Sequence, residues 1–262
     1  MIKRLLKSIA YGILIILFPV AAGVITQVKG IENIETTYLI QAICFVLAAI
    51  IGGIIYRNYR SKSKIRSKYP YKKVLYFIPI ILMEIIVLVP GYITEGFYLH
   101  NNLKLLGIIF IFTLAVGFSE EYFFRGIILK ILKEDGVKYS IIASSILFGL
   151  LHASNLLGGA NLLYTILQII YALLFGLVAA SIVTLHKSLT PVIIWHFLHD
   201  FLAFCMGDRV NGVSIELTPF MIALSSVQIL VMFLYTVYLY RQIKQSNIIG
   251  QSTDAENKDT IF

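Results

Sequence analysis

Eight apolar runs, each close to the length of a membrane-spanning helix, follow one another along this sequence. A helix needs about 20 residues to cross a hydrocarbon core ~30 Å thick. With 58% hydrophobic and only 14% charged residues, the chain does not have the composition of a water-soluble globule. The sequence therefore predicts an all-α fold, a polytopic transmembrane helical bundle of about eight spans. The predicted spans are Ile9–Val28, Tyr38–Tyr56, Val74–Ile93, Leu105–Leu132, Ser140–Leu157, Leu162–Leu185, Pro191–Met206 and Pro219–Tyr240.

The positive residues predict how the chain is oriented. Cytoplasmic loops of membrane proteins carry an excess of Lys and Arg. With both termini inside, 18 of the 22 Lys and Arg residues fall on the cytoplasmic side, eight of them in segment 57–73. We expect a multi-pass protein of the cell membrane with both termini cytoplasmic. Residues 1–240 form its helical membrane domain, and the polar cytoplasmic tail 241–262 is expected to be disordered.

Ionisable side chains inside three of the predicted spans are the candidates for function. A charge at bilayer depth is expensive and by default faces a protein interior or a water-filled cavity. The other spans carry almost none, so we expect these residues to form one site. They are Glu120, Glu121 and Arg125 in the fourth span, His152 in the fifth, and His196, His199 and Asp200 in the seventh.

Helical spacing separates the two adjacent glutamates. Glu121 and Arg125 stand at i and i+4, on one helix face and within reach of an ion pair, whereas Glu120 points about 100° away. We predict that Glu121 and Arg125 form a supporting, structural pair and that Glu120 remains free. By the same spacing His196 and Asp200 share a face of the seventh span.

Counting residues from the ends of the spans gives a depth for each candidate. Glu120, His152, His196 and Asp200 are all expected between the midplane and the cytoplasmic surface, in one polar site open to the cytoplasmic side. A carboxylate and a histidine there could act as general base and partner in hydrolysis. The zinc signature HExxH is absent, yet three histidines and two acids could hold a metal across helices.

Three motifs in these spans resemble those of one family. "EEYFFRG", "FGLLH" and "HFLHD" match the EExxxR, FxxxH and HxxxN/D motifs, in that order, of the CAAX prenyl protease and bacteriocin-processing family. This family of intramembrane endopeptidases is also called CPBP or Abi, and it includes the type II CAAX prenyl endopeptidases. The resemblance covers about residues 105–206, which would be the family core.

The resemblance implies a role for each matching residue. Glu120 is similar to the family's general base, with His152 beside it, and His196 and Asp200 correspond to its oxyanion-stabilising pair. Better-studied members have Asn where this chain has Asp200, and an ionised Asp would repel an oxyanion. Either Asp200 is protonated, or it orients His196 and leaves oxyanion binding to the imidazole.

We therefore expect a glutamate-dependent intramembrane endopeptidase whose partners are a peptide or membrane-protein substrate and the lipid bilayer. Whether the substrate is prenylated stays open. We expect no cofactor, no metal and no nucleic acid. The alternatives are a metal-dependent intramembrane protease, a non-catalytic immunity or scaffold protein of the membrane, and a proton-coupled transporter.

Overall fold

A computed structural model describes residues 1–59, 75–97, 102–207 and 219–259. Within these ranges the chain is helical, apart from short turns and an isolated antiparallel bridge between Phe97 and Met206. The predicted all-α bundle is therefore confirmed. The elements are α1 (Ile2–Val28), α2 (Ile34–Tyr59), α4 (Ile78–Glu95), α5 (Leu103–Glu121), η2 (Tyr122–Ile128), α6 (Leu129–Lys133), α7 (Val137–Leu151), η3 (His152–Gly158), α8 (Leu162–His186), α9 (Thr190–Cys205) and α10 (Pro219–Asp259).

Six helical segments in the described ranges are long and apolar enough to cross a membrane, with α5, η2 and α6 counted as one and α7 and η3 as another. Two further apolar helices, α4 and α9, are shorter. The 16 residues of α9 span about 24 Å, less than a full hydrocarbon core. The eight predicted runs thus all appear as apolar helices, but two of them fall short of a complete span.

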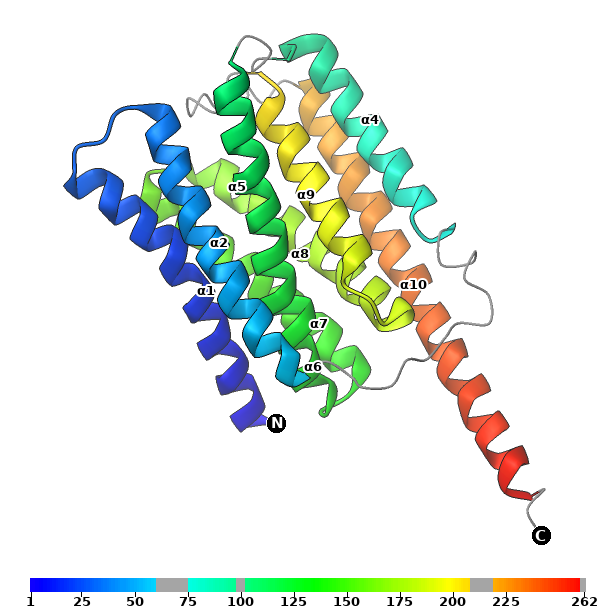
Figure 1. Ribbon diagram of the computed structural model, residues 1–262. Helices are drawn as coiled ribbons and strands as arrows, with labels where there is room; N and C mark the ends of the chain where they lie inside the picture. Colours follow the sequence, from blue (N-terminus) through cyan, green and yellow to red (C-terminus); the bar gives the residue numbers. More distant parts are fainter. Residues whose placement is uncertain (60–74, 98–101, 208–218, 260–262) are drawn as a thin grey trace.

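The helices alternate in direction, so the bundle has two distinct ends (Figure 1). At the proximal end, where α1 begins and α10 ends, Arg4 forms an ion pair with Glu134 at 2.8 Å. At the distal end, where α1 turns into α2 and α9 ends, Lys104 pairs with Glu35 at 2.6 Å. Each contact joins segments that are distant in sequence, one pair at each end of the bundle.

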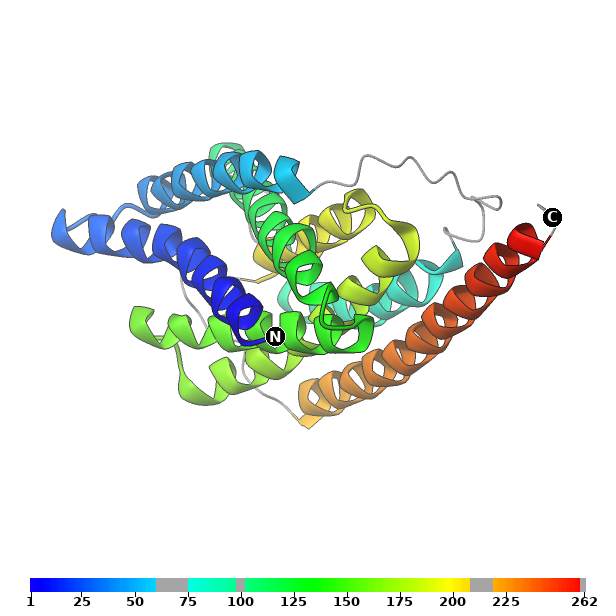
Figure 2. The ribbon, with the colours of Figure 1, turned by 90° about the horizontal axis from the view of Figure 1, so that it is seen from below.

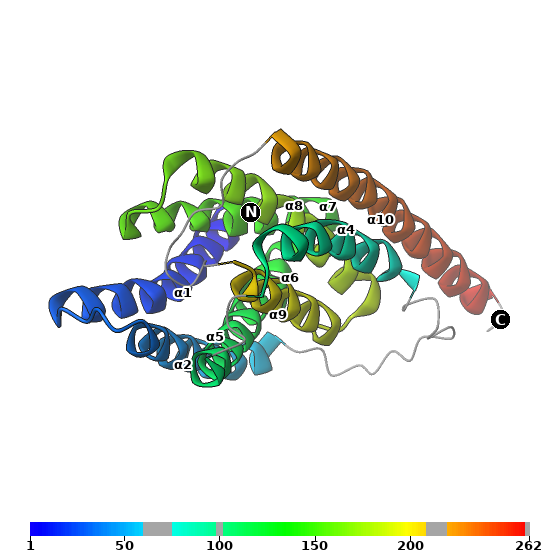
Figure 3. The same ribbon diagram turned by 90° about the horizontal axis from the view of Figure 1, so that it is seen from above.

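Viewed along the bundle, α2 and α10 lie on opposite sides, with α8 and α9 between them (Figures 2 and 3). The outer helices expose large apolar side chains, such as Leu17 on α1, Ile54 on α2 and Leu230 on α10. The core is centred on η2 and α8, where Phe123 and Val178 are fully buried. This arrangement suits a bundle whose surface faces lipid.

Small residues hold α7 against α8. A Cβ added at Gly149 would lie 3.0 Å from the carbonyl oxygen of Ile169, and one at Gly176 would lie 3.0 Å from Cβ of Ser145. Helices in membranes approach closely where such residues face each other. This contact fixes the position of His152, which directly follows α7.

The end of α10 differs from the predicted end of the last span. The sequence places that end at Tyr240, but the helix continues to Asp259, and Ile243 is still buried in the core. The disorder expected for the tail 241–262 stays a prediction.

Candidate active site

The opening motif lies where α5 changes into a π-helical segment. Glu120 and Glu121 end α5, and Arg125 is inside η2. The backbone N–H of Leu129 donates to the carbonyl of Phe124, five residues earlier. Short π-helical turns interrupt α-helices frequently at functional sites, because they shift the side chains out of the regular 3.6-residue register.

A glycine brings this region close to α9. A Cβ added at Gly117 would lie 3.2 Å from the backbone nitrogen of Phe197 and 3.3 Å from the carbonyl oxygen of Ile193. Gly117 is one turn before Glu121 on α5, and Ile193 is about one turn before His196 on α9. The close approach of the two helices therefore allows the glutamate of one to reach the histidine of the other.

Glu121 connects α5, η2 and α9 in one buried chain of polar contacts. Nη1 of Arg125 donates to Oε1 of Glu121 at 3.0 Å, and both side chains are almost fully buried. The predicted ion pair is confirmed. The same Oε1 also lies 2.9 Å from Nδ1 of His196, a contact that the sequence did not reveal. The guanidinium of Arg125 lies 4.1 Å from the centre of the Phe148 ring, a cation–π geometry.

Glu120 faces a different environment. Its Oε2 lies 3.7 Å from Nε2 of His196, beyond hydrogen-bond distance, and it has no hydrogen-bond partner among the described residues. The side chain lines a small cavity of about 100 Å³ together with His152 and Phe148. A buried carboxylate oxygen without a partner is energetically costly, and a catalytic role is one explanation for it; Oε2 of Glu121 also has no partner among the described residues, but Glu121 does not line this cavity.

His152 lies between this small cavity and a larger one, since it lines both. It is the first residue of the 3₁₀ segment η3, where the helix of α7 ends. Its Nδ1 is 2.9 Å from the carbonyl oxygen of Phe148, so Nδ1 carries the hydrogen and donates it. In the neutral ring Nε2 is then a free acceptor. Glu120 and His152 thus share a cavity wall without a direct contact.

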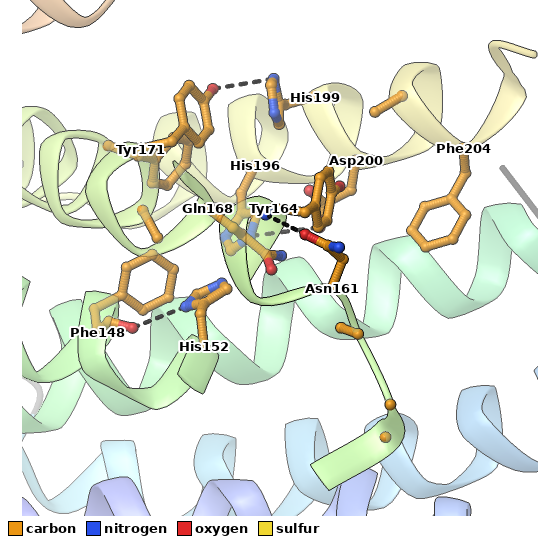
Figure 4. A pocket seen from close by; sticks show the side chains of 16 residues that line it. Phe148, His152, Asn161, Tyr164, Gln168, Tyr171, His196, His199, Asp200 and Phe204 are labelled. Carbon is orange, nitrogen blue, oxygen red and sulfur yellow. Dashed lines mark hydrogen bonds and ion pairs between the residues drawn. The ribbon is translucent and has the colours of Figure 1, made fainter. Parts of the chain in front are cut away.

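The larger cavity has a volume of about 680 Å³ and contains the other predicted residues (Figure 4). Oδ2 of Asp200 lies 3.5 Å from Nε2 of His196 on the same helix, and its side chain is 26% exposed. His199 also lines this cavity, although it lies off the face shared by His196 and Asp200. The other lining residues include Phe148, Asn161, Tyr164, Gln168, Tyr171, Phe175, Ala203 and Phe204.

The larger cavity extends along α8 and α9. Its wall includes Gly158 to Asn161, before α8, and Phe204 near the end of α9, all toward the distal end of the bundle. The sequence predicts a site open to the cytoplasmic side, and this stays a prediction.

A second acid–histidine pair adjoins the site. Glu84 on α4 accepts from Nε1 of Trp195 at 2.8 Å, and its other oxygen is 2.9 Å from Nδ1 of His199. The ring of Tyr171 stacks on His199. Sequence reasoning passed over Glu84, although a carboxylate in the middle of the third apolar run was the signal that could have found it.

The donor atoms do not gather as in a usual metal site. Within the part of the chain that the structure describes, no group of three or more His, Cys, Asp and Glu side chains has an arrangement suited to a metal ion. His196 uses Nδ1 for Glu121 and His152 uses Nδ1 for a backbone carbonyl, so each has only Nε2 left. These two nitrogens, with Glu120 and Asp200, are the donors that a metal would have to use.

Comparisons with known proteins address the same segment. Residues 102–202 match the family described as type II CAAX prenyl endopeptidase Rce1-like. No curated protein and no solved structure gives a significant match. The matched residues include α5, η2, η3 and most of α9, and therefore Glu120, His152, His196 and Asp200. Residues 102–202 of this multi-pass membrane protein thus carry an Rce1-like domain of the CAAX protease family.

Proposed function

We propose that this protein is an intramembrane endopeptidase that hydrolyses peptide bonds with a glutamate-activated water. The proposal rests on one observation. Two cavities that share His152 are lined by residues from three segments of the chain, and these residues include Glu120, His152, His196 and Asp200. The matched family, whose description names an endopeptidase, supports the reaction class.

Water activation is assigned to Glu120 and His152. A carboxylate oxygen without a hydrogen-bond partner can accept a proton from a water molecule in the small cavity. Nε2 of His152 can accept that water's second hydrogen and orient its lone pair toward the substrate. The hydroxide attacks the carbonyl carbon, and the proton held by Glu120 then passes to the nitrogen of the departing amine, so that two peptide products form from one peptide and one water.

Stabilisation of the oxyanion is assigned to His196. Glu121 accepts from Nδ1, which fixes the ring and leaves Nε2 between Glu120 and Asp200. A protonated His196 would donate from Nε2 to the oxygen that becomes negative in the transition state. The 3.5 Å distance between Asp200 and Nε2 supports the alternative in which Asp200 orients and balances the imidazolium.

The substrate is proposed to be a peptide or a segment of a membrane protein. A cavity of about 680 Å³ has room for several side chains, and its amide groups, from Asn161 and Gln168, suit the polar main chain of an extended peptide. No Lys or Arg is among the residues that line it in the described ranges.

The test is the substitution Glu120→Gln, which keeps the shape of the side chain and removes the base. We expect peptide cleavage to fall by about 100-fold or more while the melting temperature is retained. The matched control is Glu134→Gln on an exposed glutamate at the proximal end. Peptide and protein termini from cells with each form would be compared. Wild-type cleavage by Glu120→Gln would refute the mechanism, and identical termini in cells with and without the wild type would favour a non-catalytic immunity or scaffold role.

A further inference from the structure

His199 is a histidine of the larger cavity to which the proposed mechanism gives no role. It lies on α9, three residues after His196 and one before Asp200, and its side chain lines the cavity (Figure 4). That side chain is 18% exposed, so part of the ring is in contact with the cavity. An ionisable side chain at membrane depth is a candidate for function by default.

Two neighbours hold the ring of His199 in one orientation. Its Nδ1 lies 2.9 Å from one carboxylate oxygen of Glu84, and the other oxygen accepts from Nε1 of Trp195 at 2.8 Å. On the other side, the ring of Tyr171 stacks on the imidazole, with 5.1 Å between the ring centroids. A group that is fixed in its binding orientation loses little conformational entropy when a ligand arrives.

The second ring nitrogen of His199, Nε2, is available to the cavity. Glu84 and the hydroxyl of Tyr171 both approach Nδ1, and Nε2 has no hydrogen bond within the described ranges. Nε2 is also not one of the fully buried polar atoms there that lack a partner. Because Nδ1 carries the hydrogen that Glu84 accepts, Nε2 is an acceptor in the neutral ring and a donor in the charged ring. In either form it can bind one of the two polar groups of a peptide bond, the N–H or the C=O.

His199 repeats the arrangement of His196. In each residue Nδ1 is 2.9 Å from a carboxylate oxygen, that of Glu84 for His199 and that of Glu121 for His196. Residues three apart on a helix have Cβ atoms about 5–6 Å from each other. An extended peptide advances about 3.3 Å per residue. A peptide whose scissile carbonyl lies at Nε2 of His196 therefore has another peptide group, one or two residues away, within reach of His199.

We propose that His199 is a substrate-binding residue whose Nε2 forms a hydrogen bond with a main-chain peptide group one or two residues from the scissile bond. Glu84 is then a positioning residue that orients the imidazole. The partner is the backbone of an extended peptide, not a particular side chain. That this peptide is a substrate rests on the proposed function, whereas its binding at His199 does not require cleavage. Glu84 precedes residues 102–202, so this part of the site lies outside the segment that matches the family.

Two substitutions separate binding from structure. His199→Asn places an amide N–H near the position of Nδ1, so it can still donate to Glu84, but it has no polar atom at the position of Nε2. His199→Gln brings an amide group to the position of Nε2 instead. Both are made in the Glu120→Gln protein, so that bound peptides stay intact. If His199 only supports the fold, His199→Asn is the milder change; if it binds peptide, His199→Gln is.

The probe is a set of five-residue peptides of alanine, leucine and phenylalanine that are capped at both ends and carry a fluorophore. Their affinity for the purified proteins is measured by fluorescence anisotropy, beside the melting temperature. We expect His199→Asn to weaken binding about 5-fold or more without a fall in melting temperature, and His199→Gln to recover part of this loss. Glu134→Gln in the same background, at an exposed glutamate, is the control.

The position of the contact is found with modified forms of the tightest-binding peptide. An N-methyl group removes one N–H, and a thioamide weakens one carbonyl acceptor. At one position along the peptide, one of these changes should weaken binding when His199 is present and should have no effect in His199→Asn, because the contact is already lost.

Three outcomes would overturn the proposal. They are equal affinities of His199→Asn and its parent for every peptide, modified peptides that lose the same affinity with both proteins, and no binding of any peptide to the parent. None of these measurements needs cleavage. If the Glu120→Gln test succeeds while His199→Asn has no effect, the mechanism stands and His199 belongs to the wall alone.

Discussion

At the scale of single residues, the two adjacent glutamates differ in what surrounds them. Oε1 of Glu121 accepts two hydrogen bonds, one from Arg125 and one from His196. Oε2 of each glutamate has no hydrogen-bond partner among the described residues, but Glu120 lines the small cavity and Glu121 does not. Neighbouring residues on a helix point about 100° apart, so the sequence spacing alone predicted that the two side chains would have different surroundings. His196 is the second donor to Glu121 because α5 and α9 lie close together. The spacing of residues within one helix does not predict the distance between two helices.

A structural role for Arg125 predicts a loss of folded protein. Arg125→Ala leaves the buried carboxylate of Glu121 without its cation, and breaking a buried pair typically costs about 3–5 kcal/mol. We expect a lower yield of folded protein and a lower melting temperature, with cleavage reduced accordingly. Arg4→Ala, which removes an exposed ion pair with Glu134, should change stability by about 1 kcal/mol or less. Arg125→Ala protein that is as stable as wild type but inactive would assign Arg125 to the chemistry.

Glu84 is expected to stabilise the wall of the larger cavity. Glu84→Ala removes the acceptor for Trp195 and leaves Nδ1 of His199 with only its 3.3 Å contact to the Tyr171 hydroxyl, and a buried donor left without a partner costs about 1–3 kcal/mol. We expect a clear fall in melting temperature. Glu84→Gln keeps an acceptor for Trp195 and should recover part of the loss. Equal melting temperatures for wild type and Glu84→Ala would show that these donors find water instead.

At the scale of elements, the sequence predicted the apolar helices well and their irregularities poorly. Runs of about 20 apolar residues identify helices because lipid leaves few alternatives, and the charges within them marked three segments, α5 with η2, η3 after α7, and α9, as the candidate site. The π-helical segment η2 was not predicted. A π-turn and an α-turn share the same apolar pattern over seven residues, and packing against neighbouring helices decides between them.

The contact of α5 with α9 gives a prediction about spacing. Gly117→Val would place a branched side chain against the backbone of α9, where a Cβ alone would be 3.2 Å from the nitrogen of Phe197. The helices must separate, which weakens the Glu121–His196 contact and should lower cleavage by about 10-fold or more. Gly107→Val in the same helix is the control, because a Cβ there meets nothing within 4 Å. Similar activities for the two variants would mean that the close approach is not needed.

At the scale of the whole molecule, the two features that concern function are the distribution of Lys and Arg along the bundle and the lining of the larger cavity. The distribution of Lys and Arg predicted which segments share an end, and among the described ones Figure 1 shows the start of α1, the turn between α6 and α7 and the end of α10 toward the proximal end. The full lining of the cavity was not predicted, because it depends on helix tilt, on the short α9 and on the loop from Gly158 to Asn161. None of these has a signature in hydropathy.

Metal content is likewise a property of the whole purified protein, and we expect hydrolysis to need no metal. Nδ1 of His196 is bound to Glu121 and Nδ1 of His152 to a backbone carbonyl, so the remaining nitrogens of these two residues come from different helices, and the third histidine of the cavity, His199, is paired with Glu84. Hydrolysis through Glu120 requires only a carboxylate that accepts a proton from water. Cleavage by the purified protein should therefore survive exhaustive chelation, and elemental analysis should find well below one metal ion per chain. The Glu120→Gln protein, treated identically, is the control for residual cleavage by contaminants. If chelation abolishes activity and one equivalent of a metal restores it, then Glu120, His152 and His196 act as ligands, and the water is activated by the metal instead of the glutamate.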